Sequence, residues 1–129
     1  MAERQPILPP GMTANPAFSP AVRVGELLFV SGQVAQDNDG KVVGPGDCEA
    51  QTRQVMARIQ TILEAAGSSL AEVVKITTFL TDGSNYPAFS KVRAETFPNR
   101  PPASSTVMVA ALVRPEYLVE VEAVAHIPG

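Results

Sequence analysis

The spacing of apolar residues along the chain predicts two helices. Apolar side chains recur at every third or fourth position over residues 47–67, which is the pattern of a helix that buries one face. Asp47 can cap the start of this helix, and Gly67 can end it in the left-handed conformation. A second helix is predicted over residues 84–97, with Pro87 near its first turn.

Runs of β-branched residues and alternating polarity predict five strands. Residues 21–34 indicate two short strands joined at Gly25 and Glu26, where a leading glycine suits a type II′ hairpin turn. Three further strands are predicted at residues 73–81, 104–112 and 117–127. Within the last strand, the two-residue period places the apolar side chains on one face and Glu120, Glu122 and His126 on the other.

The order of these elements predicts an α+β fold with a mixed sheet and both helices on one face. The chain is expected to form a single domain over residues 1–129, and its proline-rich residues 1–18 are expected to be irregular. The helices can cover one face of the sheet. The face that carries Glu120 should therefore line a cleft or a subunit interface.

Composition narrows the classes of function. Hydrophobic residues make up 45% and charged residues 18% of the 129 residues, as in soluble globular proteins. The net charge is −3 and the 10 Lys and Arg form no run, which argues against a nucleic-acid surface. No apolar run approaches the length of a membrane span, and the one cysteine, Cys48, permits no intrachain disulfide, so we expect a cytoplasmic protein.

Few residues could carry chemistry. Glu120 and Glu122 point the same way, about 7 Å apart along the strand. They could act as an acid and a base, or they could line a solvated strand edge. His126 is the only histidine and no cluster has metal-ligand spacing, so neither a metal site nor a catalytic triad is expected. Cys48, at a helix start, is expected to be a half-buried small residue.

Several stretches resemble the Rid/YjgF family of reactive-intermediate deaminases. These are "PAVRVGELLFVSGQVA", "QTRQVMARIQTILEAAGSSLAEVVKITTFLTD", "RPPASSTVMVAAL" and "LVEVEAVA", which occur in order and at matching spacing over about residues 18–127. The resemblance implies a chorismate-mutase-like fold and a homotrimer whose sheets form an inner barrel, with pockets in the clefts between subunits. It also implies hydrolysis of small enamines and imines to a 2-keto acid and ammonia, without metal or cofactor.

The family's site residues are matched unevenly. Ser31 matches a pocket serine, and Glu120 matches the glutamate thought to position the attacking water. Ser104 stands where active members carry the arginine that grips the substrate carboxylate, and Thr106 replaces a pocket cysteine. By the two-residue period, Ser104, Thr106 and Met108 share one strand face, which we expect to look into the same cleft as Glu120.

Arg93 or Arg100 could supply a substitute cation for the missing arginine, or each could be an ordinary surface charge. Arg93 aligns with a pocket residue of the family and is the better candidate. Arg100 is the alternative.

Three functions remain open from the sequence. The chain could be a deaminase-like hydrolase with altered or weak activity, in which Glu120 is catalytic and Ser31, Arg93, Ser104 and Thr106 bind substrate. It could be a non-catalytic trimer that binds a small metabolite. The ribonuclease function ascribed to some relatives has little support in an acidic chain.

Overall fold

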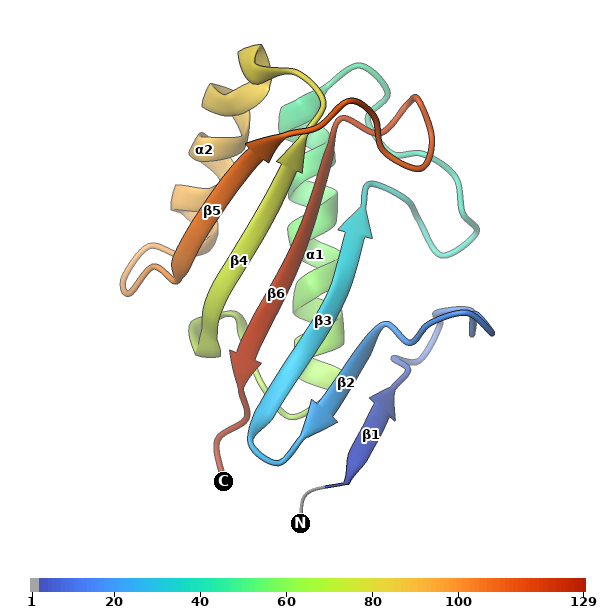
Figure 1. The fold of residues 1–129 in the computed structure, drawn as a ribbon, viewed down its shortest axis with the longest axis vertical. Helices are drawn as coiled ribbons and strands as arrows, with labels where there is room; N and C mark the ends of the chain where they lie inside the picture. Colours follow the sequence, from blue (N-terminus) through green and yellow to red (C-terminus); the bar gives the residue numbers. More distant parts are fainter. Residues whose placement is uncertain (1–2) are drawn as a thin grey trace.

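The computed structural model describes residues 3–129, which form a six-stranded mixed sheet and two α-helices (Figure 1). The strands are β1 Arg4–Ile7, β2 Ala21–Val24, β3 Leu27–Val34, β4 Val73–Leu80, β5 Ala103–Met108 and β6 Val119–His126. The helices are α1 Cys48–Ala65 and α2 Tyr86–Thr96, with short 3-10 turns η1 Leu70–Glu72 and η2 Gly83–Asn85. The strand order is β1-β2-β3-β6-β4-β5, and β4 and β5 run parallel while the other neighbours are antiparallel.

The local signals in the sequence act where they were expected. The Asp47 carboxylate accepts a hydrogen bond of 3.0 Å from the backbone N–H of Ala50 and caps α1. Gly67, just after α1, has φ +81°, in the left-handed region. At the β2–β3 turn, Gly25 has φ +61° and Glu26 has no positive φ, which fits the predicted type II′ hairpin.

The expectation of an irregular segment over residues 1–18 was wrong for Arg4–Ile7. These residues form β1, which pairs antiparallel with β2 and buries Ile7. Pro6 lies within this strand, and an edge strand tolerates a proline because one side of it has no hydrogen-bonding partner. The short strand gives too little apolar alternation to be recognised among the prolines around it.

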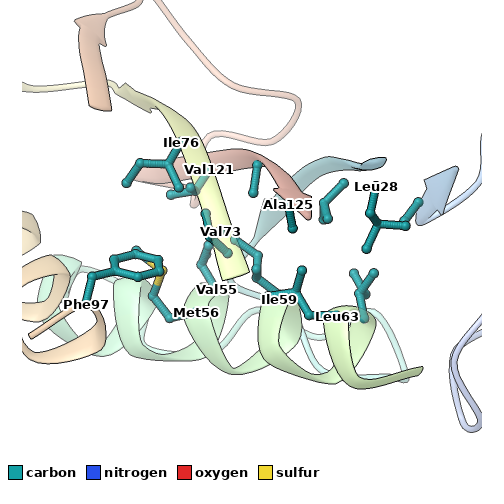
Figure 2. Close-up of a cluster of buried hydrophobic side chains, with 14 of the residues drawn as sticks. Leu28, Val55, Met56, Ile59, Leu63, Val73, Ile76, Phe97, Val121 and Ala125 are labelled. Carbon is teal, nitrogen blue, oxygen red and sulfur yellow. The ribbon is translucent and has the colours of Figure 1, made fainter. Parts of the chain in front are cut away.

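Both helices lie on one face of the sheet, as predicted (Figure 1). The core forms between this face and α1, where Val55, Ile59 and Leu63 of the helix meet Leu28 and Val121 of the sheet (Figure 2). Within residues 3–129, neither helix is long and apolar enough to cross a membrane.

The opposite face of the sheet is left uncovered by the helices. Leu27 and Phe29 of β3 are 44% and 47% exposed, and Val107 of β5 is 44% exposed. The strand register places Val107 beside Phe79 and Glu120 on this face. An exposed apolar sheet face of this kind is typical of a surface that meets another protein subunit.

The penultimate strand is shorter than the predicted 104–112. β5 ends at Met108, which pairs with Leu80, the last residue of β4. Because β4 ends there, the chain beyond Met108 has no strand to continue against. It crosses instead to β6, which lies between β3 and β4.

Candidate functional site

A cavity of about 980 Å³ brings together two of the predicted site residues, Ser31 and Glu120. Its wall is built by the segment before β2, the end of β3, the loop after β3, α1 and the segment before β6. The lining residues used below are Ser31, Gly32, Gln33, Arg58, Arg114 and Glu120. A single chain therefore already brings Ser31 and Glu120 to one cavity.

The Glu120 carboxylate lies over a β-bulge in β3. Val30 pairs with Ala123 and Gln33 pairs with Val121, so β3 carries one extra residue at Ser31 and Gly32. A Cβ atom at position 32 would overlap Oε2 of Glu120. A side chain at position 32 would therefore displace the Glu120 carboxylate from this place, and only glycine leaves room for it.

The Ser31 hydroxyl is held by the segment that precedes β2. Its Oγ donates a hydrogen bond of 2.6 Å to the carbonyl of Ser19, and the Ser31 backbone N–H donates to the carbonyl of Pro20. Since the hydroxyl proton is engaged, the oxygen faces a ligand as an acceptor. Ser31 can thus accept a hydrogen bond from a water molecule or from an N–H group.

Partial burial raises the pKa of Glu120, and the nearby charge of Glu122 raises it further. Both effects disfavour the ionised form and give Glu120 a higher proton affinity than an exposed glutamate. A higher proton affinity makes the ionised carboxylate a stronger base, which favours a role in proton transfer.

Ser104 and Thr106 do not face Glu120, contrary to the prediction. Ser104 pairs with Ile76 and Thr106 with Thr78, and both partners are buried on the face that the helices cover. Paired residues of neighbouring strands point to the same face, so Ser104 and Thr106 point toward the helix side, opposite to Glu120. The prediction failed because side-chain alternation sorts the residues of one strand into two faces. It does not show which of those faces lies on the same side of the sheet as a given face of another strand.

Arg93 of α2 lies against Ser104. Its Nη1 donates to the Ser104 Oγ at 3.1 Å, and its Nη2 donates to the Tyr86 hydroxyl at 2.8 Å and to the Ser90 Oγ at 3.3 Å. The guanidinium also lies 5.5 Å and 5.1 Å from the ring centroids of Tyr86 and Phe89. The pairing of Arg93 with position 104 places a guanidinium beside the serine, whereas Arg100 is exposed.

The hydrogen bond from Arg93 lowers the pKa of Tyr86. The three side-chain partners of Arg93 are hydroxyls, and no carboxylate among residues 3–129 lies within ion-pair distance of it. Because its partners are neutral hydroxyls and aromatic rings, the positive charge of Arg93 can still pair with an anionic ligand.

The endoribonuclease L-PSP family model matches residues 11–127. The chain belongs to this family. It is 35% identical to the yeast protein YEO7, with 98% of this chain and 100% of that chain covered and a TM-score of 0.91. YyfA of Yersinia pestis, described as a Rid family protein, is 34% identical, with 97% and 100% covered and a TM-score of 0.91.

Rv2704 of Mycobacterium tuberculosis, described as a member of the YjgF/YER057c/UK114 family, is 32% identical, with 97% and 100% covered and a TM-score of 0.82. The resemblance to the Rid/YjgF family that the sequence indicated is thus confirmed, together with its α+β fold.

Two polar residues of this L-PSP family chain were missed by the sequence analysis, Gln33 and Arg58. Arg58 of α1 donates from Nε to the Gln33 Oε1 at 3.1 Å, and both residues line the Glu120 cavity. In the sequence, Gln33 lies within a predicted strand and Arg58 within a predicted helix, and no motif marks either residue as functional. Only the bulge in β3 and the position of α1 against it bring them together, and the sequence carries no signal for that meeting.

His126 and Cys48 lie away from Glu120. The His126 ring contacts the Glu72 carboxylate at 3.1 Å and lies at the opposite end of β6 from Glu120. Cys48 is buried, and burial raises the pKa of its thiol, which disfavours the reactive thiolate. Across residues 3–129, no group of three His, Cys, Asp or Glu side chains could hold a metal ion.

The raised pKa of Glu120 predicts how stability depends on pH. Because the folded chain binds this proton more tightly than the unfolded chain, the free energy of unfolding falls as pH rises from the unfolded to the folded pKa. Glu120→Gln cannot ionise and should escape this loss. Its stability relative to wild type should therefore be greater at about pH 7 than at about pH 3.5, below the usual glutamate range.

Urea denaturation of both proteins at one protein concentration measures this difference. Glu116→Gln, which changes an exposed glutamate, is the control and should show no such pH dependence. A stability difference that is the same at both pH values would mean that Glu120 is not destabilised as an anion in the folded chain.

Proposed function

We propose that the chain is a Rid-type hydrolase that converts small imines or enamines of 2-amino acids to a 2-keto acid and ammonia. The observation that carries the proposal is the Glu120 carboxyl, seated over Gly32 in a cavity that Ser31 also lines. The family membership supports it, because the matched residues 11–127 include both Ser31 and Glu120.

The chemistry requires one water molecule and no redox partner. Water attacks the imine carbon while Glu120 takes one of its protons, and the new C–O bond forms as the C=N π pair moves to nitrogen. Glu120 then returns that proton to the nitrogen to give a carbinolamine. In the second half, Glu120 takes the hydroxyl proton and delivers it to the nitrogen, so that the C–N bond breaks, the keto group forms and ammonia leaves. An enamine enters the same sequence after its β-carbon gains a proton and its nitrogen loses one, which gives the imine.

We propose further that the complete site forms between subunits of a homotrimer. Glu120 and Arg93 lie on opposite faces of one sheet, so a single chain cannot direct both at one small substrate. The uncovered apolar face and the edge strand β5 supply surfaces where a neighbour could bring its Arg93 to the Glu120 cavity.

In this arrangement Arg93 grips the substrate carboxylate and Ser104 holds Arg93 in place. Arg93 thus supplies from α2 the cation that position 104 lacks. Thr106, partly buried two residues further along β5, is proposed to line the same edge of the cleft. The natural substrate class then remains a carboxylate that carries an imine or enamine, as for the family.

The competing function is a trimer that binds a small metabolite without turning it over. The serine at position 104 favours this function, because the active enzymes bind the substrate carboxylate through an arginine at that position. Here the carboxylate would be bound by Arg93 alone. Ammonia release from freshly generated 2-iminobutyrate separates the two functions. Binding of 2-keto acids without ammonia release would identify the non-catalytic protein.

A ribonuclease function is named for the family model, but among residues 3–129 no histidine lines the Glu120 cavity. His126, the only histidine of the chain, is engaged with Glu72 at the other end of β6. Three expectations stay predictions: the chain binds no nucleic acid, it is cytoplasmic, and it needs no metal or cofactor.

Replacing Glu120 should remove the acid–base group. We expect Glu120→Gln to lower the rate of ammonia release by about 100-fold or more, the usual scale of acid–base help. Glu64→Gln, on the exposed side of α1, should keep the wild-type rate. A folded Glu120→Gln protein with the wild-type rate would remove Glu120 from the mechanism.

Replacing Arg93 should weaken binding of 2-keto acids. Loss of a charge-assisted hydrogen bond costs about 1.5–3 kcal/mol, which corresponds to about 10- to 150-fold in affinity for pyruvate or 2-ketobutyrate. Calorimetric titration of Arg93→Gln measures this loss. Lys91→Gln, which removes an exposed cation of the same helix that pairs with Glu49, is the matched control. Equal affinities of wild type and Arg93→Gln would show that Arg93 is not the grip.

The trimer itself is open to a direct measurement. Light scattering of the wild-type chain should give a mass three times the chain mass of 13.6 kDa. A mass equal to that of one chain would contradict both the trimer and the composite site.

A further inference from the structure

The bulge that carries Ser31 and Gly32 is fixed from the helix side by a relay of hydrogen bonds. Arg58 Nε donates to Gln33 Oε1 at 3.1 Å, and Gln33 Nε2 donates to the carbonyl of Ser31 at 3.1 Å. Gln33 is 6% exposed, so this amide has few other partners available. A bulge interrupts the ladder of strand hydrogen bonds, and its shape therefore depends on contacts such as these.

Arg58 also sets the direction of the relay. A guanidinium can only donate, so the oxygen of the Gln33 amide must face Arg58 and its NH₂ group must face the Ser31 carbonyl. The same guanidinium donates from Nη1 to the carbonyl of Gln36 at 3.2 Å and lies 3.4 Å from the Asn38 Oδ1. One rigid fork thus joins α1 to both ends of the segment from the bulge to the following loop.

The partners of Arg58 are neutral oxygens, and no carboxylate of residues 3–129 lies within ion-pair distance of it. The charge of Asp37 interacts with Arg58 at longer range. The Asp37 carboxylate itself accepts hydrogen bonds from the backbone N–H groups of Asp39 and Lys41. Burial without an ion pair lowers the pKa of Arg58. Arg58 is half-buried and donates its hydrogen bonds to a side-chain amide and a backbone carbonyl. These contacts fix the positions of its partners and do not neutralise its charge.

We propose that Arg58 and Gln33 are positioning residues that hold the bulge in the shape on which the Glu120 carboxylate is seated. Gly32 lies between the two residues that the relay fixes, Ser31 and Gln33, and the carboxylate rests directly on it. When the relay is broken, the bulge relaxes and Glu120 moves toward water. Only the kinetic consequence of this inference rests on the proposed function.

The first test is an NMR titration of the labelled Glu120 carboxyl in the full chain, assigned by its absence in Glu120→Gln. Arg58→Lys keeps the charge but loses the fork, and Gln33→Met keeps the shape but loses both hydrogen bonds. In each variant the pKa of Glu120 should fall toward that of an ordinary glutamate, because the carboxyl gains hydration.

Two controls separate geometry from charge. Arg114→Gln removes a positive charge from the wall of the same cavity without touching the bulge, so it should leave the pKa of Glu120 unchanged or raise it. Arg53→Lys makes the same substitution as Arg58→Lys at an exposed site on α1 and should have no effect. The other ionisable groups that line the cavity, Asp37, Asp39 and Tyr117, are left intact in every variant.

The second test is kinetic. Both relay variants should lower kcat for ammonia release by about 10-fold with KM close to wild type, since a displaced base slows the chemical step more than binding. Arg58→Lys alters one half-exposed side chain and decides the question if Gln33→Met does not fold.

The outcomes distinguish the two claims. An unchanged pKa of Glu120 in the folded variants, with ammonia still released at the wild-type rate, would overturn the positioning role and leave the proposed function standing. A lowered pKa in a protein whose wild type releases no ammonia would support the positioning role and contradict the proposed function.

Discussion

The contact between the Glu120 carboxylate and the bare backbone of Gly32 is the constraint on which the site depends. It requires a residue without a Cβ in the bulge, a β6 register that brings Glu120 opposite Val34, and anchors that keep the bulge in shape. Ser19 and Pro20 supply those anchors on one side through Ser31, and Arg58 supplies them on the other through Gln33. The same contact withdraws the carboxyl from water, and this burial raises its pKa.

The alternation of side chains in a sheet imposes the second constraint. Ser104 faces the helices and Glu120 faces away from them, so the sheet lies between the two side chains. Only at the β3 bulge do residues of the helix side, Gln33 and Arg58, reach the cavity that Glu120 lines. Arg93 reaches Ser104 because both lie on the helix side, at the β5 edge of the sheet. In the proposed mechanism the carboxylate-binding Arg93 and the base Glu120 are therefore separate within one chain, and a contact between subunits would unite them.

The sequence was sufficient for the helices, for the hairpin turn and for the apolar face of β6, because caps, glycines and periodicity act locally. It was also sufficient to place Ser31 and Glu120 together, through the family resemblance. It could not show β1, whose prolines mask a four-residue edge strand, nor the face to which Ser104 points, which depends on pairing with β4. The role of Arg58 could not be predicted from the sequence, because its hydrogen-bonding partners lie in β3 and the loop after it, and only the packing of α1 brings them together.

The composite site can be tested most directly by mixing subunits. Glu120→Gln and Arg93→Gln chains, each impaired alone, are co-expressed and the mixed trimers are assayed for ammonia release. If each site takes Glu120 from one subunit and Arg93 from its neighbour, some clefts in the mixed trimers contain both native residues, and activity should return to a measurable fraction of wild type. Activity no greater than that of the separate variants, in trimers shown to contain both chains, would contradict the composite site.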